Sequence, residues 1–429
     1  MTNRQTRARS SPAPSGPAEP LGTATRRGAL RLLDAVLRRG EALEAALPGA
    51  TRAVHGPDRG LAHAIAAEAL RRLPDLDALI DAQTRQRLPD DAKARFALRI
   101  ALVQVLALGT PPHAAIATVL PLVDGGPRKL VHGVFGAIMR SGAVLPAVPT
   151  LPGDTAARWA AAWGDEVATA AARAFAAPPS LDLTLADARW AAELGGRSLA
   201  PGHLRLDDAA PVPELPGYRE GGWWVQDLAA SFPARLIGEG NGTALDLCAA
   251  PGGKLCQLAA AGWRVTGVDA SESRLARLRD NLTRTGLRAA VVRADLLQWT
   301  PDASADAVLL DAPCSATGIY RRHPDVLHRV RPAVIAERAA LQAALLARAA
   351  DWVRPGGVLV YATCSLEPEE GERQAERFLG DRADYALEPP VAGELPVPAS
   401  DRGWVRTLPG MLEADGGCDG FFIARFRRR

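Results

Sequence analysis

The stretch Asp306-Ala-Val-Leu-Leu-Asp-Ala-Pro-Cys-Ser315 points most directly to the fold class. Its apolar run, Ala307–Leu310, has the length and composition of a strand buried on both faces of a parallel sheet. Pro313 has no amide hydrogen to donate, so it marks the carboxyl end of that strand. Ligands of open parallel sheets bind just beyond this end. We therefore expect Asp311 and Cys314 to lie at a functional site.

A second stretch, Gly357-Val-Leu-Val-Tyr-Ala-Thr-Cys-Ser365, repeats this arrangement and ends in Cys364. Neighbouring strands lie about 4.8 Å apart. If the two strands are neighbours, the thiols of Cys314 and Cys364 meet over one pocket.

The bulk properties are those of a multidomain globular protein. A chain of 429 residues predicts two or three domains, and 48% apolar with 23% charged residues is an ordinary balance. The formal charge of +3 permits nucleic-acid binding without requiring it. No apolar run approaches the roughly 18 residues of a membrane helix. The Arg-rich start lacks the apolar stretch of a secretory signal.

The five cysteines are an odd number without Cys-x-x-Cys spacing, and the seven histidines are scattered. This pattern disfavours a disulfide scaffold and a metal site, so we expect no metal and a reducing, cytoplasmic location.

The domain organisation follows from shifts in composition. Residues 1–22 are rich in Ser, Pro, Ala and Arg, which predicts a disordered tail. A solvated tail is favoured for Arg4, Arg7 and Arg9, with contact to an RNA backbone as the alternative. Residues 23–141 have helical periodicity and predict an all-helical domain. The expected helices cover Ala29–Leu37, Leu61–Leu73, Ala92–Leu108, Ala114–Leu122 and Leu130–Met139, with breaks at Pro111-Pro112 and at Gly125-Gly126-Pro127.

Residues 142–154 contain three prolines among small residues and predict a linker. Residues 155–221 begin with a helical pattern and continue as a mixed segment, either a small RNA-contacting subdomain or a packing bridge. Trp223-Trp224-Val225-Gln226-Asp227 is predicted to open a helix that runs to Ile237. Residues 222–429 alternate strands and helices, which is typical of a parallel α/β sheet. The expected strands are 244–248, 264–269, 289–293, 306–311, 357–362 and 421–426.

A glycine turn follows the first of these strands, in Leu245-Asp-Leu-Cys-Ala-Ala-Pro-Gly-Gly-Lys254. A Walker A loop is excluded because Cys248 and Leu255 occupy the positions of its first glycine and its Ser/Thr. The Gly-x-Gly-x-x-Gly pattern is absent because Gly252 and Gly253 are adjacent. A turn without a phosphate cradle suits a cofactor without a pyrophosphate, such as S-adenosylmethionine.

Three successive strand ends carry an acid, which favours a cofactor site over isolated turn residues. Asp269 is placed to accept hydrogen bonds from ribose hydroxyls. Asp295 would accept from the adenine amino group. Asp311 would face the methionine moiety or the substrate base.

Three motifs carry a family resemblance: Cys248-Ala-Ala-Pro-Gly-Gly-Lys254, Asp311-Ala-Pro-Cys-Ser-Ala-Thr-Gly318 and Ala362-Thr-Cys-Ser365. They resemble the motifs of RNA 5-methylcytosine methyltransferases, and Thr407–Gly410 and Asp419–Ala424 resemble that family's C-terminal signature. Ala316 departs from the usual glycine, and Leu255 from the common threonine.

The N-terminal helical region resembles the NusB-like RNA-binding domain at Arg27–Leu33, Leu106–Ala115 and His132–Arg140. Together, the two resemblances indicate the RsmB (Sun/Fmu) group of ribosomal RNA methyltransferases.

The resemblance implies a Rossmann-like, S-adenosylmethionine-dependent methyltransferase domain preceded by an all-α NusB-like domain. It implies methylation of carbon 5 of a cytosine in 16S ribosomal RNA, of the cytosine-967 type, through a covalent intermediate. By the family pattern Cys364 is the nucleophile, Cys314 assists elimination, and Asp311 assists protonation at ring nitrogen 3. The implied cofactor-binding residues are Cys248, Ala249, Ala250, Pro251, Gly252, Gly253, Lys254, Asp269, Arg274, Asp295 and Asp311.

The expected partner is RNA, either 16S ribosomal RNA or a small-subunit assembly intermediate, bound by a monomer. Arg321, Arg322 and His323 are candidates for phosphate contacts, with a solvated loop as the alternative. Alternatives for the whole chain are a transfer RNA methyltransferase and a non-catalytic RNA-binding assembly factor. A nicotinamide oxidoreductase is disfavoured by the missing Gly-x-Gly-x-x-Gly.

Overall fold

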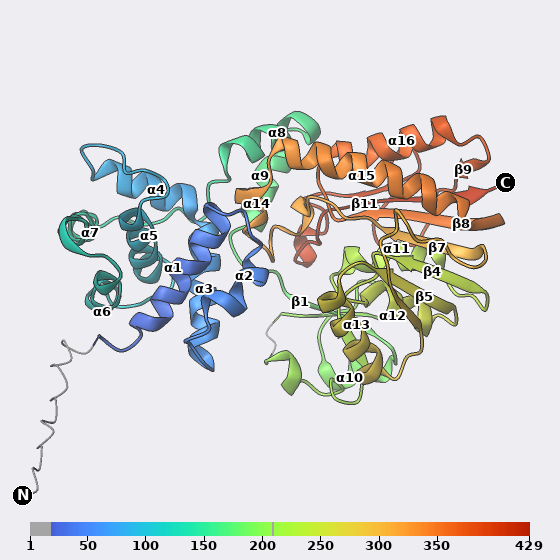
Figure 1. The fold of residues 1–429 in the computed structure, drawn as a ribbon, viewed down its shortest axis with the longest axis horizontal. Helices are drawn as coiled ribbons and strands as arrows, with labels where there is room; N and C mark the ends of the chain where they lie inside the picture. Colours follow the sequence, from blue (N-terminus) through green and yellow to red (C-terminus); the bar gives the residue numbers. More distant parts are fainter. Residues whose placement is uncertain (1–18, 208–209) are drawn as a thin grey trace, which may run out of the picture. The chain divides into compact units, whose positions relative to one another are not determined.

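The computed structural model describes residues 19–207 and 210–429 (Figure 1). Of the predicted tail at residues 1–22, positions 1–18, which include Arg4, Arg7 and Arg9, lie outside the described residues. The chain forms two compact units, one ending at Leu145 and one beginning at Pro146. Across the described ranges, no helix is both long and apolar enough to cross a membrane.

In the first unit, all regular secondary structure among residues 19–145 is helical. They are α1 (Thr23–Leu37), α2 (Leu43–Ala50), α3 (Pro57–Arg71), α4 (Leu73–Ala82), α5 (Lys93–Leu106), α6 (Pro112–Val119), a 3-10 turn (Leu120–Leu122) and α7 (Gly125–Arg140). Helix α5 is buried along most of its length. Its Arg99 forms a bidentate ion pair with Asp77 on α4, with both distances 2.8 Å.

The five expected helices are present, but α2 and α4 were not predicted. Both are short and contain a proline, Pro48 within α2 and Pro74 in the first turn of α4. The two predicted breaks between helices are present, but they lie a few residues earlier than predicted, at 107–111 and 123–124. Pro112 is the first residue of α6, and α7 begins at Gly125. Proline is tolerated in a first turn because the amide hydrogens there have no helical partner.

The second unit begins with a helical hairpin and a small sheet. The hairpin is α8 (Gly153–Trp163) and α9 (Asp165–Ala174). The sheet has the order β2-β1-β3, all antiparallel, with β1 (Leu181–Leu185), β2 (His203–Leu206) and β3 (Trp223–Val225); α10 (Arg189–Leu194) lies between β1 and β2 in sequence. This sheet accounts for the mixed segment that the sequence left unassigned.

The prediction that Trp223 opens a helix is wrong. Trp223 and Trp224 belong to β3, where they pair with β1 and are almost fully buried. Large aromatic side chains suit a half-buried pleated surface. The helix is α11 (Leu228–Ile237), and Asp227 caps it by accepting a hydrogen bond from the Ala229 amide at 2.9 Å.

The main sheet has eight strands in the order β10-β11-β8-β7-β4-β5-β6, with β9 paired to β11. The bounds are β4 (Thr243–Leu247), β5 (Arg264–Asp269), β6 (Ala290–Arg293), β7 (Ala305–Asp311), β8 (Val353–Thr363), β9 (Tyr385–Leu387), β10 (Val405–Thr407) and β11 (Phe421–Arg428). Strands β8, β7, β4, β5 and β6 are parallel, whereas β11 pairs antiparallel with β8. The predicted parallel α/β sheet is confirmed, with its strands displaced by a few residues at most at the predicted ends.

Helices cover both faces of this sheet (Figure 1). Helices α11, α12 (Gly253–Ala260) and α13 (Glu272–Thr285) contribute to the apolar core on one face. Helices α15 (Pro332–Asp351) and α16 (Glu372–Asp381) contribute to the core on the other. The short α14 (Val326–Arg329) packs with the α8–α9 hairpin. In sheets of this layered kind, ligands bind beyond the carboxyl ends of the parallel strands.

Candidate active site

The two cysteine loops leave neighbouring strands of the main sheet. Strand β7 pairs with β8 in parallel register, with Asp311 opposite Ala362. Cys314 follows β7 by three residues, and Cys364 directly follows β8. Parallel register places both loops at the same edge of the sheet.

The structure brings the two thiols into contact. The Sγ atoms of Cys314 and Cys364 are 3.4 Å apart, and both residues are partly exposed. The Gly318 amide donates to the carbonyl of Cys364 at 3.0 Å, which ties the first loop to the second. The expected juxtaposition of the two sulfurs is present.

The environment favours the protonated form of the Cys314 thiol. Its hydrogen bond with Cys364 and its burial both raise the pKa of Cys314, and the nearby Glu370 carboxylate adds to this. A thiol that retains its proton can donate it in a hydrogen bond. Cys314 is therefore suited to donate its S–H to a thiolate at Cys364.

A lysine–aspartate pair lies beside the thiols. Lys254, in the first turn of α12, donates from Nζ to Asp311 Oδ2 at 2.8 Å, and its ammonium lies 5.3 Å from the centre of the Phe421 ring. Burial opposes the ammonium charge, but attraction to Asp311, with a contribution from Cys364, outweighs it and raises the pKa of Lys254. Lys254 is thus held as a cation at the strand ends.

A cavity of about 450 Å³ opens over this pair. It is lined by the turn residues Ala249–Lys254, by Asp246 and Asp311, and by side chains from β3 and α13. Its volume is in the usual range for small-molecule sites, about 300–1,000 Å³. Asp246 is fully buried, and within the described part of the chain neither of its carboxyl oxygens has a hydrogen-bond partner. Burial, followed by repulsion from Asp311, raises the pKa of Asp246 well above its usual value.

The glycine turn has the backbone that a close ligand contact requires. Cys248 has φ 62° and Gly252 has φ 108°, both in the left-handed region. A Cβ on Gly252 would come within 3.1 Å of the Leu278 side chain. Burial raises the pKa of Cys248 far above its usual value, so this cysteine contributes shape and not a thiolate. It is the backbone of this turn that lines the cavity.

The other predicted cofactor residues lie at the next two strand ends. Asp269 is buried and accepts from the amides of Ala250 at 3.2 Å and Ser271 at 2.9 Å. Arg274 lies 3.6 Å from Asp269 and donates to the Ala250 carbonyl. Asp295 is exposed, following β6. Asp269, Arg274 and Asp295 do not line the cavity at Lys254 and Asp311, so they mark a separate stretch of the same sheet edge.

The expectation that Arg321 and Arg322 contact phosphates is not supported. Arg321 is 4% exposed, and its guanidinium pairs with Asp227 and with Asp419 at 3.2 Å. Arg322 pairs with Asp227 at 2.9 Å and with Asp419 at 3.4 Å. Through these ion pairs, both arginines connect the loop after Cys314 to the N-terminus of α11 and to the residues just before β11. Arg322 and His323 both line the cavity.

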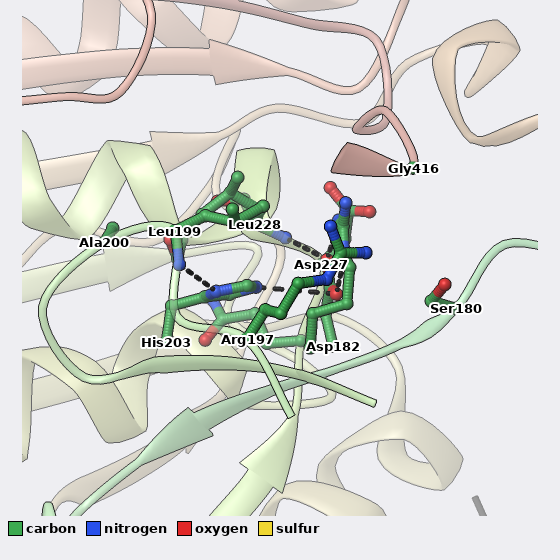
Figure 2. A network of polar contacts seen from close by, with 12 residues as sticks. Ser180, Asp182, Arg197, Leu199, Ala200, His203, Asp227, Leu228 and Gly416 are labelled. Carbon is green, nitrogen blue, oxygen red and sulfur yellow. Dashed lines mark hydrogen bonds and ion pairs between the residues drawn. The ribbon is translucent and has the colours of Figure 1, made fainter. Parts of the chain in front are cut away.

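The small sheet is joined to α11 of the main α/β layers by a buried charge network (Figure 2). Asp182 on β1 is fully buried and accepts two hydrogen bonds of 2.6 Å from Arg205 on β2. Figure 2 shows Asp182 also accepting from the Leu228 amide at 3.0 Å and facing the His203 ring at 3.4 Å. These contacts support the packing-bridge interpretation of the segment, because its polar residues are engaged with α11.

The sequence analysis missed Glu370, which contacts both cysteine loops. Glu370 is fully buried in a 3-10 turn, Pro368–Glu370, six residues after Cys364. The one available signal was its place in the acidic run Glu367-Pro-Glu-Glu370, which reads as a solvated turn. In the described part of the chain, no cluster of three His, Cys, Asp or Glu side chains is arranged to hold a metal ion.

Comparison with protein families gives two matches. A family described as 16S rRNA methyltransferase RsmB/F matches residues 235–427, and the NusB family matches residues 23–140.

Two curated relatives span nearly the whole chain. The chain is 34% identical to ribosomal RNA small subunit methyltransferase B of Klebsiella pneumoniae subsp. pneumoniae, over 94% of this chain and 97% of that protein. It is 36% identical to the protein of the same name from Xanthomonas campestris pv. campestris, again over 94% and 97%.

Two solved structures share the fold. The crystal structure of PH0851 has a TM-score of 0.74 at 21% identity and covers 95% of this chain and 99% of that one. NSun6 from Pyrococcus horikoshii with SFG has a TM-score of 0.54 at 20% identity, covering 65% and 98%.

Proposed function

The chain belongs to the RsmB family of 16S ribosomal RNA methyltransferases, and we propose that it activates its target cytosine through a covalent bond to Cys364. Enzymes of this family methylate carbon 5 of cytosine and depend on S-adenosylmethionine. The observation that carries the proposal is the 3.4 Å contact between the Cys314 and Cys364 sulfurs, beside the Lys254–Asp311 pair.

The cavity fits the cofactor. Its turn has the close-approach backbone of Gly252, it has no phosphate cradle, and it holds the buried Asp246 carboxyl without a partner among the described residues. When bound, S-adenosylmethionine supplies an electrophilic methyl group. We assign its binding to the turn from Cys248 to Lys254 and to Asp311 at the cavity, and to Asp269, Arg274 and Asp295 along the adjoining stretch of the sheet edge.

Carbon 5 of cytosine is a poor nucleophile, and we propose that Cys364 makes it a better one. Its thiolate adds to carbon 6, forming an S–C bond and moving the ring electrons toward carbon 5. Carbon 5 can then accept the methyl group. Solvent water takes up the carbon 5 proton. The electrons of that C–H bond re-form the C5–C6 double bond, and the S–C6 bond breaks to release the Cys364 thiolate. The covalent route divides one difficult step into easier ones.

Cys314 acts on the expulsion step. Because its own pKa is raised, it keeps its proton and can donate a hydrogen bond to the departing sulfur 3.4 Å away. A hydrogen bond to the leaving thiolate stabilises the charge that develops on it. This assignment explains why two thiols meet at one site.

Asp311 and Lys254 face the base that enters the cavity. We assign Asp311 to the nitrogen 3 edge of the ring. When nitrogen 3 takes up a proton, the Asp311 carboxylate accepts a hydrogen bond from the new N3–H and so favours the electron shift toward carbon 5. The Lys254 ammonium, 2.8 Å from Asp311, fixes that carboxylate in place. The target base must leave its stack to reach this position.

The substrate is RNA, and the helical unit carries the NusB-family match. We propose that residues 23–141 form the RNA-binding domain and that residues 222–429 form the methyltransferase domain. Between them, residues 142–154 are a linker and residues 155–221 are a small connecting subdomain. The proposed substrate is 16S ribosomal RNA or a small-subunit assembly intermediate, bound in the cytoplasm by a monomer.

The experiment is to map 5-methylcytosine in ribosomal RNA from a strain lacking this protein. One 5-methylcytosine of 16S RNA disappears and returns when the gene is restored, but not when the Cys364→Ala form is supplied. Loss of a transfer RNA 5-methylcytosine in place of the 16S one would reassign the substrate. An unchanged 5-methylcytosine map would reject the enzymatic function.

A further inference from the structure

The Glu370 carboxylate makes contact with both cysteine loops at once. Its Oε1 accepts a hydrogen bond from the Ser315 amide at 2.9 Å. Its Oε2 accepts one from the Ser315 hydroxyl and another from the Ser365 hydroxyl, the latter at 2.5 Å. Ser315 and Ser365 each directly follow a cysteine, at 314 and 364.

These hydrogen bonds are buried, and the groups that form them also bond to one another. Glu370 and Ser365 are fully buried, Ser315 is 3% exposed, and the two serine hydroxyls are themselves 3.2 Å apart. Thr317 joins them, because its hydroxyl lies 3.3 Å from Ser365 Oγ and accepts from the Leu366 amide at 3.0 Å. Buried hydrogen bonds to a charged acceptor are stronger than neutral ones, so they hold their donors in a defined geometry.

Glu370 is in turn held from two sides. Gln342 on α15 donates from one amide nitrogen to Glu370 Oε1 at 3.2 Å and to the Pro313 carbonyl at 2.9 Å. The Glu370 main-chain carbonyl accepts from the Tyr361 hydroxyl at 2.7 Å and from Thr363 Oγ1 at 3.2 Å. The carboxylate is thus fixed relative to β8 and to the helix that covers the sheet.

We propose that Glu370 is a positioning residue whose one carboxylate holds the Cys314 and Cys364 loops together, so that their sulfurs stay in contact for catalysis. The inference rests on the proposed roles of these two cysteines. It goes beyond them because Glu370 lies beneath the serines and outside the cavity lining. It acts through Ser315 and Ser365 and touches neither sulfur in the contacts described.

The charge of Glu370 has a second effect. It adds to the hydrogen bond with Cys364 and to burial in raising the pKa of Cys314. Burial raises the pKa of Glu370 itself, whereas the hydrogen bonds from Ser315, Ser365 and Gln342 oppose that rise. Glu370→Gln keeps a similar shape and some of the hydrogen bonds but removes the charge. Glu370→Ala removes both.

The test compares Glu370→Ala and Glu370→Gln with Glu369→Gln, a control at an exposed carboxylate that pairs with Arg373. A small displacement of reacting groups can cost about 100-fold in rate. We expect Glu370→Ala to lower kcat for methyl transfer by about that factor, with cofactor affinity and KM for RNA within about twofold. We expect Glu370→Gln to shift the pH profile of kcat to lower pH, since Cys314 loses a nearby negative charge.

A readout independent of methylation reports the sulfur geometry directly. Diamide takes up two electrons and two protons as the Cys314 and Cys364 thiols form a disulfide, which mass spectrometry of the linked peptides identifies. We expect this linkage to form at least about tenfold more slowly in Glu370→Ala, because the sulfurs are no longer held together. The Glu369→Gln control should match the unmodified protein.

Each outcome decides one question. An unchanged rate of disulfide formation and an unchanged kcat in Glu370→Ala would overturn the positioning role. So would a loss of kcat matched by an equal loss of cofactor affinity. If the unmodified protein transfers no methyl group while Glu370→Ala still slows disulfide formation, the proposed function fails and the positioning role stands. If Glu370→Ala does not fold, Glu370→Asp, whose carboxylate is one methylene short of its partners, gives the same comparison.

Discussion

Lys254 and Asp311 form an ion pair of 2.8 Å although they come from different strand connections, Lys254 from the first turn of α12 and Asp311 from the last residue of β7. Cys364, at the end of β8, contributes to the field on Lys254. Three adjacent parallel strands therefore deliver one cation, one carboxylate and one thiol to the same edge of the sheet.

Replacing Lys254 tests this arrangement. Lys254→Met leaves the Asp311 carboxylate without the cation that orients it. We expect methyl transfer to fall by about 100- to 1,000-fold, the usual cost of removing an electrostatic group from a catalytic site. A labelled-methyl assay on 16S RNA measures it, with Arg402→Met, at an exposed cation outside the cavity lining, as the control. Near-normal transfer by Lys254→Met would remove the ion pair from the mechanism.

The buried pair of Asp182 and Arg205 predicts a stability effect separate from catalysis. Arg205→Met leaves a fully buried carboxylate with one charged partner fewer, which costs about 3 kcal/mol of unfolding free energy in comparable buried pairs. Urea unfolding measures the loss. Arg197→Met is the control, since Arg197 is 44% exposed and its surface pairs should contribute about 1 kcal/mol or less. Equal effects of the two substitutions would contradict a structural role for the network.

Asp306 predicts how stability depends on pH. The Thr243 amide, at 2.7 Å, and Arg354 lower the pKa of Asp306 from 3.8 to about 2. Since the folded value lies below the unfolded one, the carboxylate stabilises the fold above pH 4 and this contribution is lost as pH falls toward 2. After allowance for solvent exposure, we expect Asp306→Asn to cost about 1 kcal/mol at neutral pH. The cost should shrink toward zero in acid, whereas Asp302→Asn, at an exposed acid, should cost little throughout.

The features that could be predicted from sequence are those set by local pattern. The apolar run before Asp311 and the run before Cys364 each define a buried strand, and parallel pairing then forces their ends together. The glycine turn at 252–253 could be placed for the same reason, because it follows an apolar strand. Ala316, where the family usually has glycine, has φ 59°, a conformation that glycine adopts without strain.

The features that could not be predicted depend on distant partners. Trp223 and Trp224 belong to β3 because β1, some forty positions earlier, pairs with them. Glu370 has an acidic neighbourhood that suggests a solvated turn, but Ser315, 55 residues away in sequence, draws it into the interior. Arg321 looked available for RNA, but Asp227 and Asp419 neutralise it. In each case tertiary contacts override the local pattern.

Cys314 predicts a trapped intermediate. Cys314→Ala removes the hydrogen-bond donor that stabilises the departing Cys364 thiolate, so the enzyme–RNA bond should form and then break slowly. We expect a covalent protein–RNA species to accumulate on a denaturing gel. The control is Cys418→Ala, which removes a buried cysteine outside the cavity lining and should show no shifted band. Normal turnover without the shifted band would remove Cys314 from the elimination step.

The most direct test of the nucleophile uses 16S RNA in which cytosine carries fluorine at carbon 5, because that substituent cannot leave as a proton does and the S–C6 bond persists. After digestion of the complex with protease and nuclease, mass spectrometry locates the peptide that carries the modified nucleotide. The covalent mechanism predicts the adduct on Cys364, and no adduct in Cys364→Ala, which still binds S-adenosylmethionine. An adduct on Cys314, or an equal yield from Cys364→Ala, would contradict it.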